Sequence, residues 1–157
     1  MRRLLSSGLM VLVGAAGPGT LSPHQTSRTH AGGPQNDPRL GTLQRFFRQC
    51  GCPAEAYTVE FLAAADAYNL DWRLLPSISF VESTGGKATQ HNNMFGWDQG
   101  RAQFASPEDG IYEVGYRLAN SETYRDKNLD TVLTTYNPVG PYAQKVRSVM
   151  RRISPVQ

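Results

Sequence analysis

Apolar side chains recur at helical spacing, with polar side chains between them, in two neighbouring segments near the middle of the chain. In residues 54–68 apolar positions recur three and four residues apart, with acidic residues between them, which predicts an amphipathic helix. Residues 71–83 have the same spacing. The apolar positions of this second segment are Leu74, Leu75, Ile78 and Val81. Asp71 is expected to cap the second helix, and Pro76 to lie in or near its first turn.

A polar, glycine-containing segment separates these two helices from three more. Residues 84–103 show no periodicity, which predicts a loop or a small hairpin lobe. Serine, proline and two acidic residues at 106–109 are typical of a helix start, and this helix is expected to run to about Asn120. Residues 129–136 and 142–153 predict two further helices, with prolines and a glycine between them. The expected fold class is therefore mainly α, with a short irregular lobe after the second helix.

The first residues have the pattern of a secretory signal peptide. Arg2 and Arg3 precede an apolar run from Leu4 to Ala16, and small residues follow it. We expect residues 1–22 to be removed on export, which makes the protein secreted or periplasmic. The apolar run is too short to span a bilayer with ease, so no stable membrane insertion is expected after cleavage. An uncleaved N-terminal anchor is the alternative.

The rest of the chain divides into a linker and one domain. Residues 23–39 are rich in Gly, Pro, Ser, Thr and Gln, and such a segment cannot offset the entropy lost on ordering, so we expect a flexible linker. Residues 40–153 are expected to form a single domain around one core. We expect it to be a monomer.

Charge and cysteine content narrow the set of partners. Removal of residues 1–22 takes Arg2 and Arg3 from the 16 basic residues and leaves 14 against 13 acidic ones, a net charge of +1. Such a balance gives no reason to expect a nucleic-acid partner. Cys50 and Cys52 flank one glycine, which leaves open either a strained disulfide or two thiols. The three histidines are too scattered for a zinc site, so neither a metal nor another cofactor is expected.

Glu82 is the carboxylate whose position fits a structural role least well. It follows Ile78 by four residues and Leu75 by seven, which places it on the apolar stripe of its helix. A carboxyl group there would be partly desolvated, which raises its pKa and suits it to protonate a leaving oxygen. The alternative is an ordinary surface glutamate at a frayed helix end.

Four sequence segments in order resemble one enzyme family. They are PSISFVESTGG, NNMFGW, AQFASPEDGI and TYNPVGPYAQKV, and the resemblance built on them covers roughly residues 54–153. They resemble the glucosaminidase family of peptidoglycan hydrolases, family 73 of the glycoside hydrolases. The resemblance implies an α+β, lysozyme-like fold, in which a helical lobe and a small loop or β lobe flank a sugar-binding cleft. It also implies cleavage of the β-1,4 bond on the N-acetylglucosamine side of the glycan strand, with Glu82 as catalytic acid.

Four residues of the NNMFGW segment are the expected substrate-binding residues, namely Asn92, Asn93, Phe95 and Trp97. Amides bond sugar hydroxyl and acetamido groups, and aromatic faces pack on pyranose rings. Structural alternatives stay open, because Phe95 also fits a core position and the two asparagines also fit a role in bracing the loop backbone.

Two further residues are catalytic candidates. Tyr136 matches the late tyrosine of the family, which is placed near the catalytic glutamate and can orient it or stabilise developing positive charge. A core-filling tyrosine is the alternative. Asp98 is the candidate for the second carboxylate of a two-carboxylate hydrolysis. The substrate's 2-acetamido group could take that part instead. Tyr142 is expected to be a packing residue.

The expected function is therefore an exported endo-N-acetylglucosaminidase whose partner is the glycan strand of peptidoglycan. Lytic transglycosylases share the fold, the Glu-Ser dipeptide and a late tyrosine, so they are the main alternative. A non-catalytic wall-binding module that keeps the cleft is the third possibility, against which the presence of Glu82 argues.

Overall fold

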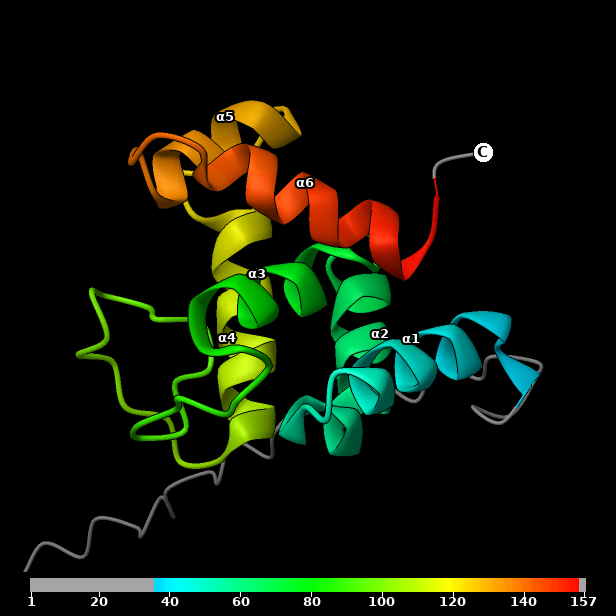
Figure 1. Ribbon diagram of the computed structural model, residues 1–157. Helices are drawn as coiled ribbons and strands as arrows, with labels where there is room; N and C mark the ends of the chain where they lie inside the picture. The colour runs from blue at the N-terminus through cyan, green and yellow to red at the C-terminus, as the bar shows by residue number, and fades with distance from the viewer. Residues whose placement is uncertain (1–35, 156–157) are drawn as a thin grey trace, which may run out of the picture. The chain divides into compact units, whose positions relative to one another are not determined.

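The computed structural model describes residues 36–155, and these fold almost entirely as helices and turns (Figure 1). The helices are α1 (Pro38–Gln49), the 3₁₀ helix η2 (Pro53–Tyr57), α2 (Thr58–Ala67), α3 (Leu74–Ser83), α4 (Pro107–Asn120), α5 (Leu129–Tyr136) and α6 (Tyr142–Ile153). The part of the chain that the structure describes contains no β-strand, so the mainly α class is confirmed. Nor does this part contain a helix long and apolar enough to cross a bilayer.

The segment between α3 and α4 is a loop of successive turns (Figure 1). Of the two alternatives for this region, a loop or a small hairpin, the structure has the loop. Most backbone hydrogen bonds within it are local, such as Asn93 N–H to Gln90 O and Gly100 N–H to Gly96 O, and a single longer-range bond from Phe104 N–H to His91 O joins its two ends in the described residues. Its order therefore depends on turns and side-chain contacts rather than on strand pairing.

The last three helices begin and end where the sequence predicts. At the start of α4, Ser106 Oγ accepts a hydrogen bond from the Asp109 N–H, and Pro107 occupies the first helical position, as its sequence favours. Asn128 caps α5 in the same way, through the Thr131 N–H. Both starts are specified by neighbouring residues alone.

The expected start of α3 at Asp71 is wrong by three residues. Asp71 Oδ1 accepts a hydrogen bond from the Arg73 N–H, and its carbonyl accepts one from the Leu74 N–H. These bonds form a separate turn, and α3 begins only at Leu74. Pro76 lies in the first turn of α3, as predicted. The helix expected over residues 54–68 is likewise divided, into η2 and α2.

The fold also begins earlier than residue 40, because Asp37 caps α1 and Pro38 is its first residue. Arg39 forms ion pairs with both Asp37 and Asp66 of the neighbouring α2 region. These contacts place residues 37–39 in the domain and not in a linker. The expected signal peptide, and the linker as far as residue 35, lie outside the described residues.

Helix α3 lies against other helices along its length and carries several core residues. It packs on α6, with further contacts to α2, while α2 also packs on α4. The largest fully buried side chains of the core include Phe47, Phe61, Leu75, Ile78 and Ile111. Burial of each such side chain contributes about 1.5–3 kcal/mol. This packing fixes the direction of α3, whose last turn carries Glu82.

Candidate active site

Glu82 is the penultimate residue of α3 and is partly buried. Burial raises the pKa of its carboxyl group, and the nearby Tyr142 hydroxyl opposes this shift. A partly desolvated carboxyl with a raised pKa holds its proton to higher pH than a surface glutamate. The group can therefore serve as a general acid.

The backbone of Gly96 lies directly against this carboxyl. A Cβ built at Gly96 would lie 2.7 Å from Glu82 Oε2 and 3.3 Å from its Cδ. Gly96 also has a φ of +60°, a conformation that glycine adopts without steric cost. Both observations favour glycine here, and the absence of a side chain lets the loop backbone lie against Glu82.

Ser83, the residue after the acid, fastens this loop to α3. Its buried Oγ lies 2.8 Å from the Met94 carbonyl oxygen and 3.0 Å from that of Ser79, and it accepts a hydrogen bond from the Gly86 N–H at 2.9 Å. The serine of the Glu-Ser dipeptide thus has a positioning role, because it holds Met94 beside the end of the helix.

Both asparagines of the NNMFGW segment brace the loop. Asn93 is buried, and its side chain bonds Trp97 twice, accepting from the Trp97 N–H at 2.9 Å and donating to the Trp97 carbonyl at 3.0 Å. Asn92 Nδ2 donates to the carbonyls of Phe104 and Ala105. Of the alternatives left open by the sequence, the structure has the bracing role, since these amides are engaged within the loop.

Phe95 contributes its backbone to the site and its ring to the core. The ring has 0% exposure and lies edge-on to Phe61, so it has no surface with which to contact a sugar. Its carbonyl accepts a hydrogen bond from the Tyr136 hydroxyl at 2.5 Å. The expected substrate contact of the Phe95 side chain is therefore replaced by the core alternative.

Tyr136 connects α5 to the loop close to the acid. Burial, followed by the nearby Glu82 carboxylate, raises the pKa of Tyr136 well above its ordinary value. The phenol therefore stays protonated and donates to Phe95 O. This contact positions the residue immediately before Gly96, so Tyr136 acts on the loop that covers Glu82.

An aromatic wall, formed by Trp97, Tyr124, Tyr136 and Tyr142, adjoins Glu82. Tyr136 is stacked on Tyr142 with ring centroids 5.9 Å apart and an interplanar angle of 4°. Trp97 stands edge-on to Tyr136 at 5.5 Å and lies 6.0 Å from Tyr124. Trp97 is partly exposed, so of the expected substrate-binding residues it has an aromatic surface available to a ligand.

Tyr142 has a second role that its sequence context did not indicate. The side chain is buried in the core, as expected, yet its hydroxyl lies near enough to Glu82 to lower the pKa of that carboxyl. The contact falls short of a full hydrogen bond, because Tyr142 Oη has no partner of good geometry among the described residues. A tyrosine at the start of a helix gives no sequence signal for such a contact.

Asp98 lies in a different environment from Glu82. Its side chain is 54% exposed and forms an ion pair with Arg101 at 2.7 Å, which lowers the pKa of Asp98. Within residues 36–155, no hydrogen bond or ion pair joins Asp98 to Glu82, and no neighbouring carboxylate contributes to the pKa shift of Glu82. The site therefore has one partly buried carboxyl, that of Glu82, while Asp98 is exposed and ion-paired.

Neither the cysteines nor a metal site adds to this picture. Cys50 is partly exposed, Cys52 is buried, and both are free thiols. In the described part of the chain, no three His, Cys, Asp or Glu side chains are grouped as they would be to hold a metal ion.

Comparison with protein families and with curated proteins finds no family model and no curated protein that matches this chain.

Proposed function

We propose that this chain is an exported glycoside hydrolase that cleaves β-1,4 bonds in the glycan strands of peptidoglycan, with Glu82 as general acid. One observation supports this function most: a carboxyl with a raised pKa at the end of a buried helix, covered by the Gly96 backbone and flanked by an aromatic wall. The resemblance of the NNMFGW segment to the glucosaminidase family supports the choice of substrate.

The chemistry follows from the protonated state of Glu82. Its proton passes to the glycosidic oxygen as the bond from that oxygen to the anomeric carbon breaks, leaving an oxocarbenium-like centre. A water molecule adds its oxygen to this carbon and returns a proton to Glu82, which restores the acid. Aromatic faces of the wall favour the developing positive charge, and Trp97 offers a face for a pyranose ring.

How the anomeric carbon is stabilised depends on a second group. Two-carboxylate enzymes place a base or nucleophile opposite the acid, and Asp98 is exposed and paired with Arg101. We therefore favour assistance by the 2-acetamido group of the substrate, with Asp98 as the alternative. A single buried acid also suits a lytic transglycosylase, in which the sugar's 6-hydroxyl replaces water, and this is the second candidate function.

Digestion of purified peptidoglycan tests the function and separates the candidates. Wild-type protein is expected to release fragments ending in reducing N-acetylglucosamine, identified by mass spectrometry. Anhydro-muramic ends, lighter by one water, would assign the transglycosylase reaction. Intact glycan strands would leave only the wall-binding module.

Glu82→Gln tests the assignment of the acid, with the exposed Glu122→Gln as matched control. Gln keeps shape and hydrogen-bonding atoms but has no proton to transfer, so lysis should fall by at least about a hundredfold. The control should lyse like wild type. Activity of Glu82→Gln above about a tenth of wild type would move the acid elsewhere.

A further inference from the structure

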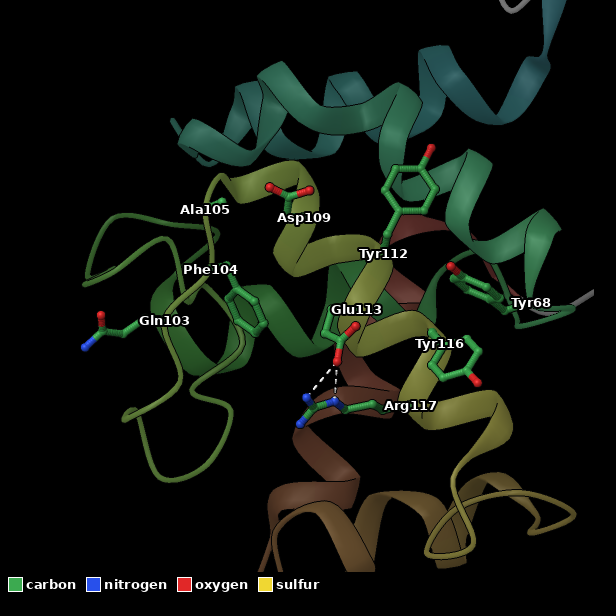
Figure 2. A pocket seen from close by; sticks show the side chains of 9 residues that line it. All are labelled: Tyr68, Gln103, Phe104, Ala105, Asp109, Tyr112, Glu113, Tyr116 and Arg117. Atoms are coloured by element: carbon green, nitrogen blue, oxygen red, sulfur yellow. Dashed lines mark hydrogen bonds and ion pairs between the residues drawn. The ribbon is translucent and has the colours of Figure 1, made fainter. Parts of the chain in front are cut away.

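A surface depression of about 650 Å³ lies on the outer face of α4 and does not include Glu82 (Figure 2). Its volume falls within the range of pockets that hold small ligands, roughly 300–1,000 Å³. The side chains that line it come from the end of α2, the loop before α4, and α4 itself. They are Tyr68, Gln103, Phe104, Ala105, Asp109, Tyr112, Glu113, Tyr116 and Arg117.

Three tyrosines give this depression aromatic surface. Tyr112 is 37% exposed and Tyr116 is 52% exposed, which makes them two of the few large apolar side chains that the described residues leave open to solvent. Tyr68 lies edge-on to Tyr116, with ring centroids 5.9 Å apart. Figure 2 shows the three rings gathered along one side of α4. Tyrosine combines a ring face with a hydroxyl, which suits ligands that have both apolar and polar faces.

The charged groups of the depression favour a ligand without negative charge. Asp109 and Glu113 line it, and Arg117, the one cation among the described residues that line it, is already paired with Glu113 at 2.6 Å. Glu60 lies close by, since burial and then the Glu60 carboxylate raise the pKa of Tyr112. Glu60 Oε2 is buried and has no hydrogen-bond partner in the part of the chain that the structure describes. Carboxylates accept from hydroxyl and amide donors and repel anions.

Arg117 links the depression to the candidate active site. Its guanidinium lies 5.5 Å from the centroid of the Trp97 ring. Trp97 in turn contacts Tyr136, whose pKa is affected by the charge of Glu82. Arg117 therefore lines the depression and also lies against Trp97, so the depression adjoins the candidate site.

We infer that the depression is an outlying saccharide subsite, which takes uncharged N-acetylhexosamine units of the same glycan strand through the tyrosine faces and the acidic acceptors. This inference rests on the proposed function for the identity of the polymer. The combination of exposed tyrosines with the carboxylates of Asp109 and Glu113 selects neutral sugar rings over the anionic polymers of a cell wall. The subsite would hold the strand at a distance from the bond that is cleaved.

The inference is tested by measuring the binding of a neutral tetrasaccharide of β-1,4-linked N-acetylglucosamine by calorimetry. The protein is the Glu82→Gln variant, because this variant should leave the sugar intact. Adding Tyr116→Ala should weaken binding by about five- to tenfold, the size of one aromatic contact. Tyr116→Trp should restore affinity to within about twofold, because it returns a ring face. Val59→Ala, an exposed apolar side chain on α2 outside the depression, is the matched control and should change nothing.

Lysis of peptidoglycan by wild type, measured in parallel, separates the two proposals. Lysis together with binding that Tyr116→Ala leaves unchanged overturns the subsite and leaves the proposed function standing. Binding that depends on Tyr116, without lysis by wild type, supports a saccharide site and removes the hydrolase. Equal loss in Tyr116→Trp and Tyr116→Ala would also overturn the subsite, because an aromatic face would then not be what binds.

Discussion

Substitution of Gly96 by alanine tests whether the loop backbone sets the environment of the acid. The added Cβ would lie 2.7 Å from Glu82 Oε2, whereas ordinary contacts begin at 3.4 Å, so the carboxyl oxygen must move by about 0.7 Å. The far end of a glutamate side chain can make such a move at little cost to folding. A misplacement of about 1 Å can nevertheless cost on the order of a hundredfold in rate. We therefore expect Gly96→Ala to lower kcat by roughly 30- to 100-fold.

Gly100→Ala is the matched control for this substitution. Gly100 also has a positive φ, +81°, but a Cβ there would meet nothing within 4 Å. Both variants incur the cost of a left-handed backbone, about 1–2 kcal/mol, so both should unfold several degrees below wild type, about 4–10 °C for a domain of this size. Only Gly96→Ala disturbs Glu82, and the difference between the variants isolates that contact.

The assay is turbidity loss of a peptidoglycan suspension, with thermal unfolding followed by circular dichroism on the same samples. The expected result is similar unfolding temperatures and widely different rates. If Gly96→Ala keeps more than a third of the rate of Gly100→Ala, the backbone of residue 96 does not position the acid. If both variants lose activity equally, the loss arises from loop strain and not from contact with Glu82.

Three further substitutions have defined expected outcomes. Tyr142→Phe removes the hydroxyl that lowers the pKa of Glu82, so the pKa of Glu82 should rise. The alkaline limb of the kcat/KM profile, along which Glu82 loses its proton, should then shift to higher pH. An unchanged alkaline limb would exclude the contact between Tyr142 and Glu82. The same variant should not be less stable in thermal unfolding, since it deletes a buried hydroxyl without a partner. Tyr136→Phe leaves the Phe95 carbonyl without its hydrogen-bond donor. It should lower the free energy of unfolding in urea by about 1–3 kcal/mol and the rate of lysis about tenfold. Wild-type values for both would make Tyr136 a packing residue only. Asp98→Asn should keep at least about a third of the lytic rate, because the exposed carboxylate is paired outside the site, and a loss above about a hundredfold would establish it as the second catalytic group.

The pH dependence of stability has a defined sign at Glu82. Burial raises the pKa of this carboxyl in the folded protein above its unfolded value, so the folded state binds the proton more tightly. The stabilisation is fully present below the unfolded pKa and is lost as the pH rises through the folded pKa. Above the folded pKa, where Glu82 is ionised, the uncharged Glu82→Gln side chain should therefore be at least as stable as the glutamate, which separates loss of activity from loss of fold.

Helix boundaries were predictable where the signal is local. Ser106 and Pro107 specify the start of α4 through neighbouring atoms alone, and the sequence predicts that start correctly. Asp37 and Pro38 carry a similar signal at the start of α1, yet the residues before them lack apolar side chains, so the segment resembled a linker. What holds this start in place is Arg39 with its distant partner Asp66, and such a contact exists only in the folded chain.

The sequence predicts the candidate acid of the site, Glu82, but not the residues that surround it. Glu82 lies on the apolar stripe of its helix, which periodicity reveals. The closeness of Gly96 and Tyr142 to Glu82 depends on how the loop and α6 return to the end of α3, and residue spacing has no information on that. The asparagines show the converse, because their chemistry suits sugars equally well, but local geometry directs their amides to the loop backbone.

The loop over Glu82 is anchored by the buried side chains of Met94 and Phe95, and a few side-chain bonds set the position of its backbone. Met94 is held by Ser83 of α3, Phe95 by Tyr136 of α5, and Trp97 by Asn93. Each such bond contributes only about 0.5–1.5 kcal/mol, a small part of the roughly 5–15 kcal/mol that stabilises a domain. Loss of one such bond can therefore shift the loop backbone while the buried side chains keep the loop attached to the helices. Greater exposure of the acid to water would then lower its pKa towards that of a surface glutamate. Because the general acid must hold its proton, variants at these bonds should lose activity before they lose the fold, and the alkaline limb of their activity should move to lower pH than in wild type.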